Sequence, residues 1–288
     1  MSQILDAIGE DQRRATTSLA RELLGSLVQK DQYVGEVVSL GYDVAVVQIH
    51  DFNRQQVGGI PSLSFLVATR TNTTSDFDYM AEDSSVILLR VMDAAPLPNA
   101  AEADRVRVEA AQRVSGETDL HWDDQKMMDG TTHHLLSFAG IKCRVIGTFF
   151  VDKISNKAGA HLDLCFGSDI SNYYPNRGLK VYKPNGLALK RIVNYQAPDR
   201  SDRRTNRSVT VGDIRYASTN RSFQGVNDVS VQLMPDDLLG QKTALFGMTR
   251  TGKSNTTKVI LKSILVVGQF ESGGAECDLS GTRDGILF

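Results

Sequence analysis

Short apolar runs alternate with turn residues through most of the chain. From Tyr33 onward these runs are rich in β-branched residues, and Gly, Asn and Pro separate them. Such runs predict β-strands, because branched side chains pack well on a pleated surface. Many short strands in succession are typical of a small closed or nearly closed β-barrel. We therefore predict a barrel domain over residues 31–196, with strands within 33–52, 60–70, 84–92, 140–152, 161–168 and 178–184.

Two segments have helical periodicity instead. Residues 3–29 place leucine and isoleucine at spacings of three or four, which predicts one or two amphipathic helices and a helical arm over residues 1–30. Residues 97–114 are rich in Ala, Glu and Arg after Pro98, and Asn99 is a candidate N-cap. We expect this second segment to be a helix inserted into the barrel sequence.

The chain changes character after residue 196. Residues 197–208, APDRSDRRTNRS, contain almost nothing that could be buried, and they predict a basic linker. Beyond it, residues 209–218 and 227–240 predict two more strands. The expected fold class is therefore multidomain α+β, with the barrel followed by a second domain over residues 209–288.

Composition narrows the possible functions without choosing among them. The chain of 288 residues is 41% hydrophobic and 23% charged, and it has no apolar run near the roughly 20 residues of a membrane span. The N-terminus lacks the apolar core of a secretory signal, so we expect a cytoplasmic protein with no membrane partner. The net charge of −2 gives no overall attraction for a polyanion. Three widely spaced cysteines, Cys143, Cys165 and Cys277, are interpreted as reduced and mostly buried thiols.

Residues Gly247 to Ser254, GMTRTGKS, match the phosphate-binding pattern G-x-x-x-x-G-K-[ST]. The apolar residues 242–247 before the glycine loop predict a strand. Residues 253–268 after it predict a helix. A strand, a glycine loop and a helix in this order form the context that the motif requires. The expected apolar face of the helix consists of Thr257, Ile260, Leu261, Ile264 and Leu265.

The residue types in this loop suit a nucleotide triphosphate. Glycine at both ends permits a close approach of the backbone, so that amide N–H groups can converge on a phosphate. We expect Lys253 to be the catalytic residue and to reach the β- and γ-phosphates, while Ser254 ligates Mg²⁺. Asn255 or Thr256 is the candidate for the α-phosphate. The predicted ATP-binding residues are Gly247, Met248, Thr249, Arg250, Thr251, Gly252, Lys253, Ser254 and Asn255.

The stretch FGMTRTGKSNT, preceded by VSVQLMPDDLLGQKTAL, resembles the HerA-like ATPases of the HerA/FtsK group. Residues 121–150, 166–186 and 212–218 are similar to the bacterial branch of that family, so the resemblance spans nearly the whole chain. It implies that the barrel is of the HAS type and that residues 209–288 begin a RecA-like P-loop core. It also implies a hexameric, ATP-driven translocase of double-stranded DNA that acts with a nuclease or another effector in DNA processing or anti-phage defence.

The sequence departs from that family after the helix that follows the loop. A complete motor has a second strand, a Walker-B strand that ends in acidic residues, a polar sensor and an arginine finger. Four carboxylates near the C-terminus do not follow an apolar strand as a Walker-B acid should: Glu271, Glu276, Asp278 and Asp284. We therefore expect a chain truncated after the P-loop helix and inactive alone. The alternative function is a barrel-based assembly or partner-binding module with an incomplete core, whereas a small-molecule kinase is disfavoured because its P-loop usually comes first.

Two residue clusters invite other chemistry. His121, His133 and His134 lie near Cys143 in the sequence, but their spacing fits no familiar zinc pattern, and packing is the favoured interpretation. The second cluster is basic, and a solvated linker is favoured over a contact with DNA phosphates or a neighbouring subunit. It consists of Arg191, Arg200, Arg203, Arg204 and Arg207.

Overall fold

A computed structural model describes most of the barrel region and selected parts of the remainder. The described residues are 16–71, 78–114, 130–156, 159–175, 178–198, 208–216, 221–224, 226, 229–234, 244, 246 and 254–262. The chain divides into two compact units. One contains Met1–Ser201 and Asp213–Val229, and the other contains Asp202–Gly212 and Ser230–Phe288.

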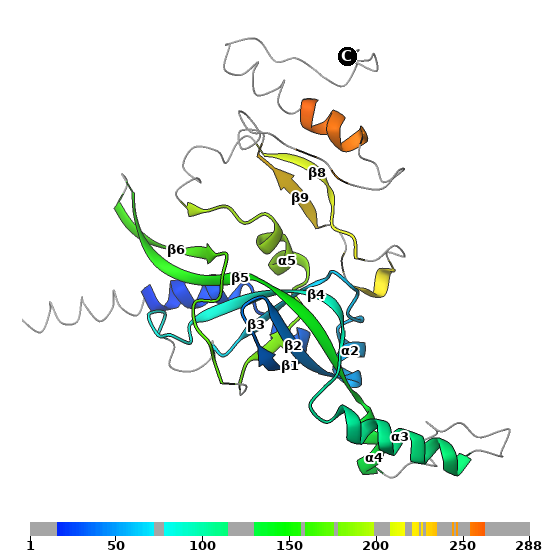
Figure 1. Ribbon diagram of the computed structural model, residues 1–288. Helices are drawn as coiled ribbons and strands as arrows, with labels where there is room; N and C mark the ends of the chain where they lie inside the picture. The colour runs from blue at the N-terminus through cyan, green and yellow to red at the C-terminus, as the bar shows by residue number, and fades with distance from the viewer. Residues whose placement is uncertain are drawn as a thin grey trace, which may run out of the picture. The chain divides into compact units, whose positions relative to one another are not determined.

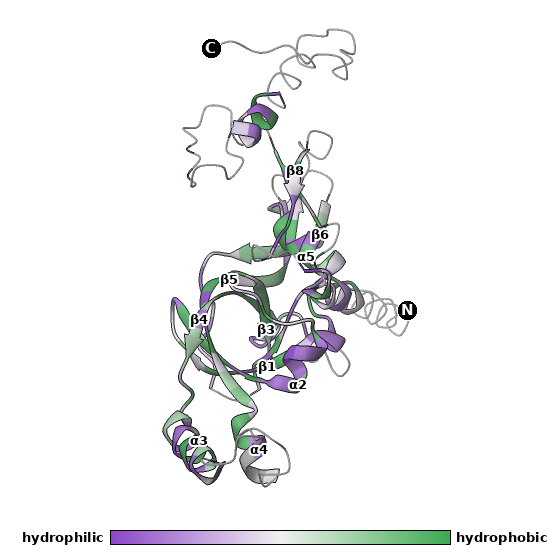
Figure 2. Ribbon diagram, turned by 90° about the vertical axis from the view of Figure 1, so that its right-hand side faces the viewer, coloured by the Kyte–Doolittle hydropathy of each residue, from purple (hydrophilic) through white to green (hydrophobic). Residues whose placement is uncertain are grey.

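Six antiparallel strands close into a barrel, as the sequence predicted. Around the ring the order is β1–β2–β5–β4–β3–β7, and β7 pairs again with β1. Figure 2 shows these strands forming a ring. Their bounds are β1 Tyr33–Leu40, β2 Val44–His50, β3 Phe65–Thr69, β4 Ser85–Ala95, β5 Phe138–Asn156 and β7 Lys180–Tyr182.

The inside of the barrel is filled by alternate apolar side chains. In β2, for example, Ala45, Val47 and Ile49 are buried, and the residues between them are half-buried. The strands approach very closely at Gly35 in β1, where an added Cβ would lie 1.9 Å from the carbonyl oxygen of Gln48. Only glycine fits there, so Gly35 allows β1 and β2 to pair through this position.

A second apolar core lies on the outer side of β3 and β4. Leu66 and Leu89 belong to the inner core, whereas their neighbours Val67 and Leu88 pack in the outer one. Both faces of these strands are buried, and this explains why their sequences are continuously apolar rather than alternating. The outer core also receives a helix over residues 16–25.

Two elements extend this outer layer. β6 (Gly159–Gly167) pairs with the part of β5 that runs beyond the barrel. α5 (Gly186–Val193) begins at Asn185, whose side chain accepts a hydrogen bond from the Gly186 amide. Arg191 of α5 donates to Ser26 Oγ over 2.7 Å, which ties α5 to the chain that follows helix 16–25. α5 was not predicted.

A pair of helices interrupts the barrel between β4 and β5. α3 (Ala100–Val114) confirms the predicted insertion, and α4 (Gly130–Leu136) contacts it just before β5. Figure 1 shows both helices projecting from one end of the barrel. A short helix after β2, α2 (Asp51–Gln56), was not predicted. It is capped by His50 Nδ1, which accepts from the Phe52 amide over 3.2 Å.

Two strands after the barrel pair with each other, as expected: β8 (Val209–Asp213) and β9 (Ser230–Leu233). A helix covers residues 254–262, within the range predicted for the helix after the glycine loop. Of the strand expected over residues 242–247, the structure describes only Ala244 and Phe246, and neither is in a strand. No described helix has the length and apolar character of a membrane span.

Candidate functional site

The predicted phosphate-binding loop is described only at its C-terminal end. Ser254 and Asn255 are the first described residues of helix 254–262, and both are exposed. Gly247, Met248, Thr249, Arg250, Thr251, Gly252 and Lys253 lie outside the described residues. The site as a whole therefore stays a prediction.

The described turn is compatible with a phosphate and a metal ion. The first amides of a helix have no partner within the helix, and the positive end of the helix dipole favours an anion beside them. The Ser254 side chain is exposed at this end, where its hydroxyl is accessible to a cation. ATP and Mg²⁺ at this loop stay a prediction, with Ser254 as the residue predicted to hold the metal.

The predicted apolar face of the helix is described at Thr257, Ile260 and Leu261, whereas Ile264 and Leu265 lie outside the described residues. Val259, Ile260 and Leu261 are half-buried. Thr257 was expected on the same face, but it is exposed, so that assignment was wrong. A position three residues before Ile260 lies near the edge of the apolar stripe, where a small polar residue is tolerated.

Lys183 is the most deeply buried charged side chain among the described residues. It follows β7 directly, and only 1% of its surface is exposed. Its Nζ donates to three carbonyl oxygens, of Val57 at 2.7 Å, Gly59 at 2.9 Å and Gln224 at 2.9 Å. Three acceptors match the three N–H groups of an ammonium, and burial lowers the pKa of Lys183 to about 8.

A second hydrogen bond also joins the barrel to the part of the chain that follows α5. The Phe65 amide donates to the Tyr216 hydroxyl over 3.3 Å. Burial raises the pKa of Tyr216 to about 12, so it is a neutral phenol at physiological pH. Tyr216 packs in a small core with Leu189 and Val229.

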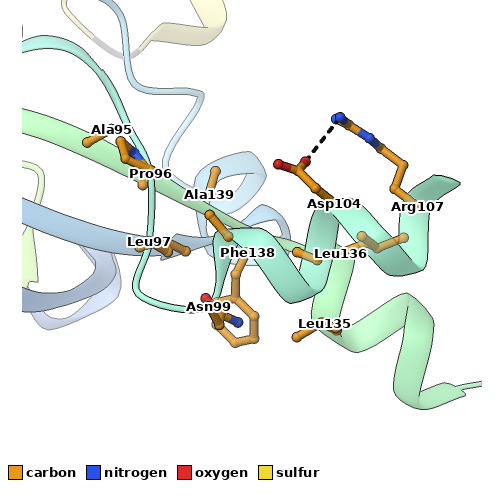
Figure 3. Close-up of a pocket in the computed structure, with 13 residues that line it drawn as sticks. Ala95, Pro96, Leu97, Asn99, Asp104, Arg107, Leu135, Leu136, Phe138 and Ala139 are labelled. Atoms are coloured by element: carbon orange, nitrogen blue, oxygen red, sulfur yellow. Dashed lines mark ion pairs between the residues drawn. The ribbon is translucent and has the colours of Figure 1, made fainter.

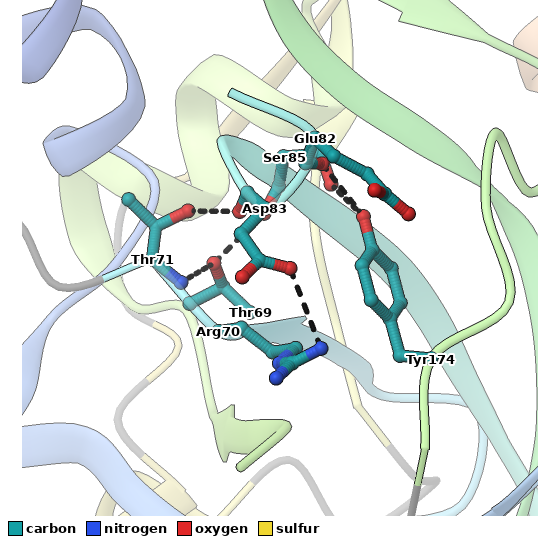
Figure 4. Close-up of polar contacts among 7 residues, drawn as sticks. All are labelled: Thr69, Arg70, Thr71, Glu82, Asp83, Ser85 and Tyr174. Carbon is teal, nitrogen blue, oxygen red and sulfur yellow. Dashed lines mark hydrogen bonds and ion pairs between the residues drawn. The ribbon is translucent and has the colours of Figure 1, made fainter. Parts of the chain in front are cut away.

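A polar network fastens one end of the barrel (Figure 4). Thr69 Oγ1 donates to the Ser85 carbonyl over 2.7 Å, and the Tyr174 hydroxyl donates to the Glu82 carbonyl over 2.9 Å. The guanidinium of Arg70 lies 5.4 Å from the centre of the Tyr174 ring. The hydroxyl protons are used within the network, which fits a structural role.

A groove of about 270 Å³ lies at the base of the α3–α4 pair (Figure 3). Leu97 and Phe138 line it from the two strand ends, and Leu135 lines it from α4. An ion pair between Asp104 and Arg107, with an N–O distance of 3.1 Å, lies on its α3 side. Polar and apolar groups thus line the groove in about equal measure.

Of the three histidines in the predicted cluster, His134 lies beside other aromatic rings. The His134 ring lies 5.6 Å from the His50 ring and 5.2 Å from the Phe138 ring, measured between centroids. Within the described ranges, no three His, Cys, Asp or Glu side chains gather as a metal site. His121 lies outside those ranges, whereas His133 is exposed on α4.

Some of the remaining cysteines, arginines and carboxylates named in the sequence analysis lie within the described residues, and others lie outside them. Cys143 is buried and Cys165 is half-buried, and both are free thiols. The expectation for Arg191 was wrong, because it belongs to α5 and bonds to Ser26 instead of lying in a solvated linker. Several residues lie outside the described part: Cys277, the other four arginines of the basic cluster and the four C-terminal carboxylates.

A model of a known protein family matches residues 216–273, and the family is described as Helicase HerA, central domain. This match supports a HerA-like family. None of the curated proteins compared with the chain matches it. We call residues 216–273 the HerA-like segment. It includes the whole Gly247–Ser254 loop and helix 254–262, and its family indicates a P-loop ATPase of the HerA type.

Proposed function

We propose that this protein binds ATP and Mg²⁺ at the Gly247–Ser254 loop and acts as a HerA-like DNA translocase. The observation that carries the proposal is the position of this loop within the HerA-like segment. The motif and the family match are independent of the barrel, and both point to the same residues. A closed β-barrel before the segment agrees with the domain order of HerA-like ATPases.

Each residue of the proposed site has a physical role. The amides of Gly247 to Gly252 surround the phosphates, and Lys253 neutralises charge on the β- and γ-phosphates. Ser254 supplies a hydroxyl ligand to Mg²⁺, and the exposure of its side chain is consistent with that role. Asn255 is the candidate for the α-phosphate.

The family further suggests how the protein would work. We propose a hexameric ring that moves along double-stranded DNA, with a nuclease or another defence effector as partner, in the cytoplasm. The proposed domains are an arm over 1–30, a HAS-type barrel over 31–196, a linker over 197–208 and a RecA-like region over 209–288.

Nucleotide binding by the whole chain tests the proposal. We expect a fluorescent ATP analogue with Mg²⁺ to bind the wild type, and Lys253→Ala to weaken binding at least about tenfold, since one charge-assisted contact to phosphate is worth about 1.5–3 kcal/mol. Lys258→Ala is the matched control, because Lys258 is exposed on helix 254–262 and lies outside the Gly247–Ser254 motif. Equal affinities for wild type and Lys253→Ala would refute the proposed site.

The α3–α4 pair favours a second candidate, a barrel that binds a partner or assembles the protein. The observation behind this candidate is the groove between these helices and the barrel, where Leu97, Leu135 and Phe138 lie beside polar groups. Mass measurements in solution, with and without ATP and double-stranded DNA, separate the two functions. Rings that form with nucleotide favour the translocase, whereas a monomer unaffected by either ligand favours the binding module.

A further inference from the structure

The outer face of the barrel carries cationic side chains where β5 lies between β2 and β4. Lys142 and Arg144 alternate with the buried Cys143 along β5, so both point to the outer face, and both are exposed. Arg90 of β4 lies directly opposite Arg144 in the ladder. Like charges at directly opposed positions repel each other, so an anion bound beside them would stabilise this face.

The described part of the chain leaves the two exposed cations without a counter-charge. Lys142 and Arg144 form no ion pair with any described residue. Arg90 differs, because its guanidinium carbon lies 5.8 Å from the centre of the Phe65 ring. Asp93 is opposite Lys142 in the ladder, but one of its oxygens accepts from the amide of the next residue over 2.8 Å. Lys142 and Arg144 can therefore take up an external anion.

The same two cations line a hollow of about 440 Å³ in the barrel wall. Cationic, acidic and apolar residues surround it: Asp43, Val44, Met92, Asp93, Lys142 and Arg144. Asp43 directly precedes β2 and Asp93 belongs to β4, so the two acidic residues come from opposite sides of β5. The hollow thus has cations from its central strand and carboxylates from both flanking strands.

A β-bulge adds an exposed apolar side chain to the hollow. In the β4–β5 ladder Val91 pairs with Cys143. The next pair joins Asp93 to Lys142, so Met92 has no partner in this ladder. Bulges redirect side chains, and Met92 is 45% exposed. Covering a large exposed apolar side chain is favourable, and the flexible methionine adapts to partners of varied shape.

We propose that this hollow binds an extended acidic segment of a partner protein. Its carboxylates contact Lys142 and Arg144, and one of its apolar side chains covers Met92. Residues two apart in an extended chain share a face at a spacing of about 7 Å, which equals the spacing of the two cations along β5. A guanidinium binds a carboxylate through two parallel hydrogen bonds, and an ammonium attracts a second carboxylate as a point charge.

The flanking carboxylates favour a peptide over a nucleic acid. Asp43 and Asp93 repel the continuous line of phosphates on a DNA duplex, which carries one charge per roughly 1.7 Å of its axis. Single carboxylate side chains can reach the cations between these two residues. A peptide also supplies the apolar side chain for Met92, which a phosphate backbone lacks. This binding does not depend on nucleotide at the Gly247–Ser254 loop.

Titration of the isotope-labelled full chain with a synthetic peptide, followed by nuclear magnetic resonance, tests the proposal. The probe is an acetylated and amidated hexapeptide of alternating glutamate and leucine. We expect saturable shifts of the amide signals of Lys142, Arg144 and Met92, with a Kd of about 1 mM. Replacing glutamate by glutamine in the peptide should abolish binding, and replacing leucine by serine should weaken it at least about threefold. Equal shifts with all three peptides, or no saturable shifts with any, would overturn the proposal.

Variants of the two cations locate the contact. Lys142→Gln and Arg144→Gln should each weaken binding of the probe at least about threefold, and the double variant at least about tenfold. Lys153→Gln is the matched control, because Lys153 is exposed on β5 but does not line the hollow. These side chains are exposed, so the variants should keep the wild-type signals elsewhere. Wild-type affinity in the double variant, or an equal loss in Lys153→Gln, would overturn the proposal.

Two other occupants of the hollow would give different results. A short DNA duplex that shifts the same signals and displaces the probe would replace the acidic segment by a nucleic acid. Sedimentation of the wild type and the double variant tests a second copy of the chain as the occupant. A wild-type oligomer that the double variant converts to a monomer would make this face a contact between copies. Either result would overturn the proposed partner, whereas failure of both supports it.

Discussion

The contribution of helix 16–25 to the stability of the barrel can be measured by comparing two leucines on this helix. Leu24 is fully buried in the outer core, together with Phe149 and Ile192, whereas Leu19 of the same helix is 43% exposed. Replacing each leucine by alanine removes the same atoms from the same element. Only Leu24→Ala leaves a cavity inside a packed core.

The two variants should therefore differ clearly in stability. Leu24→Ala should lower the free energy of unfolding by about 3–4 kcal/mol, the sum of the lost transfer free energy and the cavity. For Leu19→Ala about 1 kcal/mol or less is expected, because much of the side chain already contacts water and no cavity forms. Either loss is measurable against the 5–15 kcal/mol that is usual for a domain.

Urea unfolding followed by far-ultraviolet circular dichroism provides the comparison. Both variants should keep the wild-type dependence on urea, so the difference should show in the midpoint. Losses that agree within about 0.5 kcal/mol would refute the reasoning, because such a result requires Leu24 to be as accessible as Leu19. The helix would then not be part of the outer core.

Three further predictions concern single positions. Gly35→Ala should lower the free energy of unfolding in urea by more than about 3 kcal/mol, because the added Cβ meets the β2 backbone. Gly130→Ala is the control and should leave that free energy unchanged, because there is open space around Gly130. Similar urea midpoints for the two variants would contradict the close approach of the strands at Gly35. Burial raises the pKa of the Cys143 thiol to about 12. An alkylating reagent at pH 8 should therefore modify Cys165 at least about 100-fold faster than Cys143, which peptide mapping can measure. Comparable rates of modification would contradict a buried Cys143. Burial lowers the pKa of Lys183 in the folded chain to about 8, below its ordinary 10.5. Between these pH values the unfolded chain binds more protons than the folded chain, so the free energy of unfolding should rise with pH by up to about 3 kcal/mol relative to Lys183→Met. If the difference in unfolding free energy between the two proteins did not change with pH, the hydrogen bonds to the three carbonyl oxygens would have to offset the effect of burial on this pKa.

The barrel was predictable because its strands carry local signals. The predicted runs overlap all six barrel strands, although β4 and β5 extend beyond theirs, and the interruption at 97–114 contains α3. Turn residues and β-branched side chains act over a few positions, so a single sequence reveals them. The full length of β5 was not predictable in the same way. Its two ends are set by pairing with β2 and β6 and not by its own composition.

The features missed by the sequence depend on distant partners. Lys183 directly follows a short strand and has the pattern of a solvent-exposed lysine, but its acceptors come from residues 57–59 and from Gln224. α5 contains only eight residues, too few for a clear helical period. At the candidate site the motif supplied the residues, and of these the structure describes only Ser254 and Asn255.

Closure of the barrel has a consequence for how the chain is made. Tyr33, at the start of β1, pairs with Tyr182 of β7, and β2 pairs with β5, which comes much later in the chain. During synthesis from the N-terminus, the open edges of β1 and β2 must persist until these later strands leave the ribosome. Such distant pairing is slow, and exposed edges favour association with other chains. Nascent protein should therefore be most prone to aggregate, and most in need of a chaperone, before residue 182 has been synthesised.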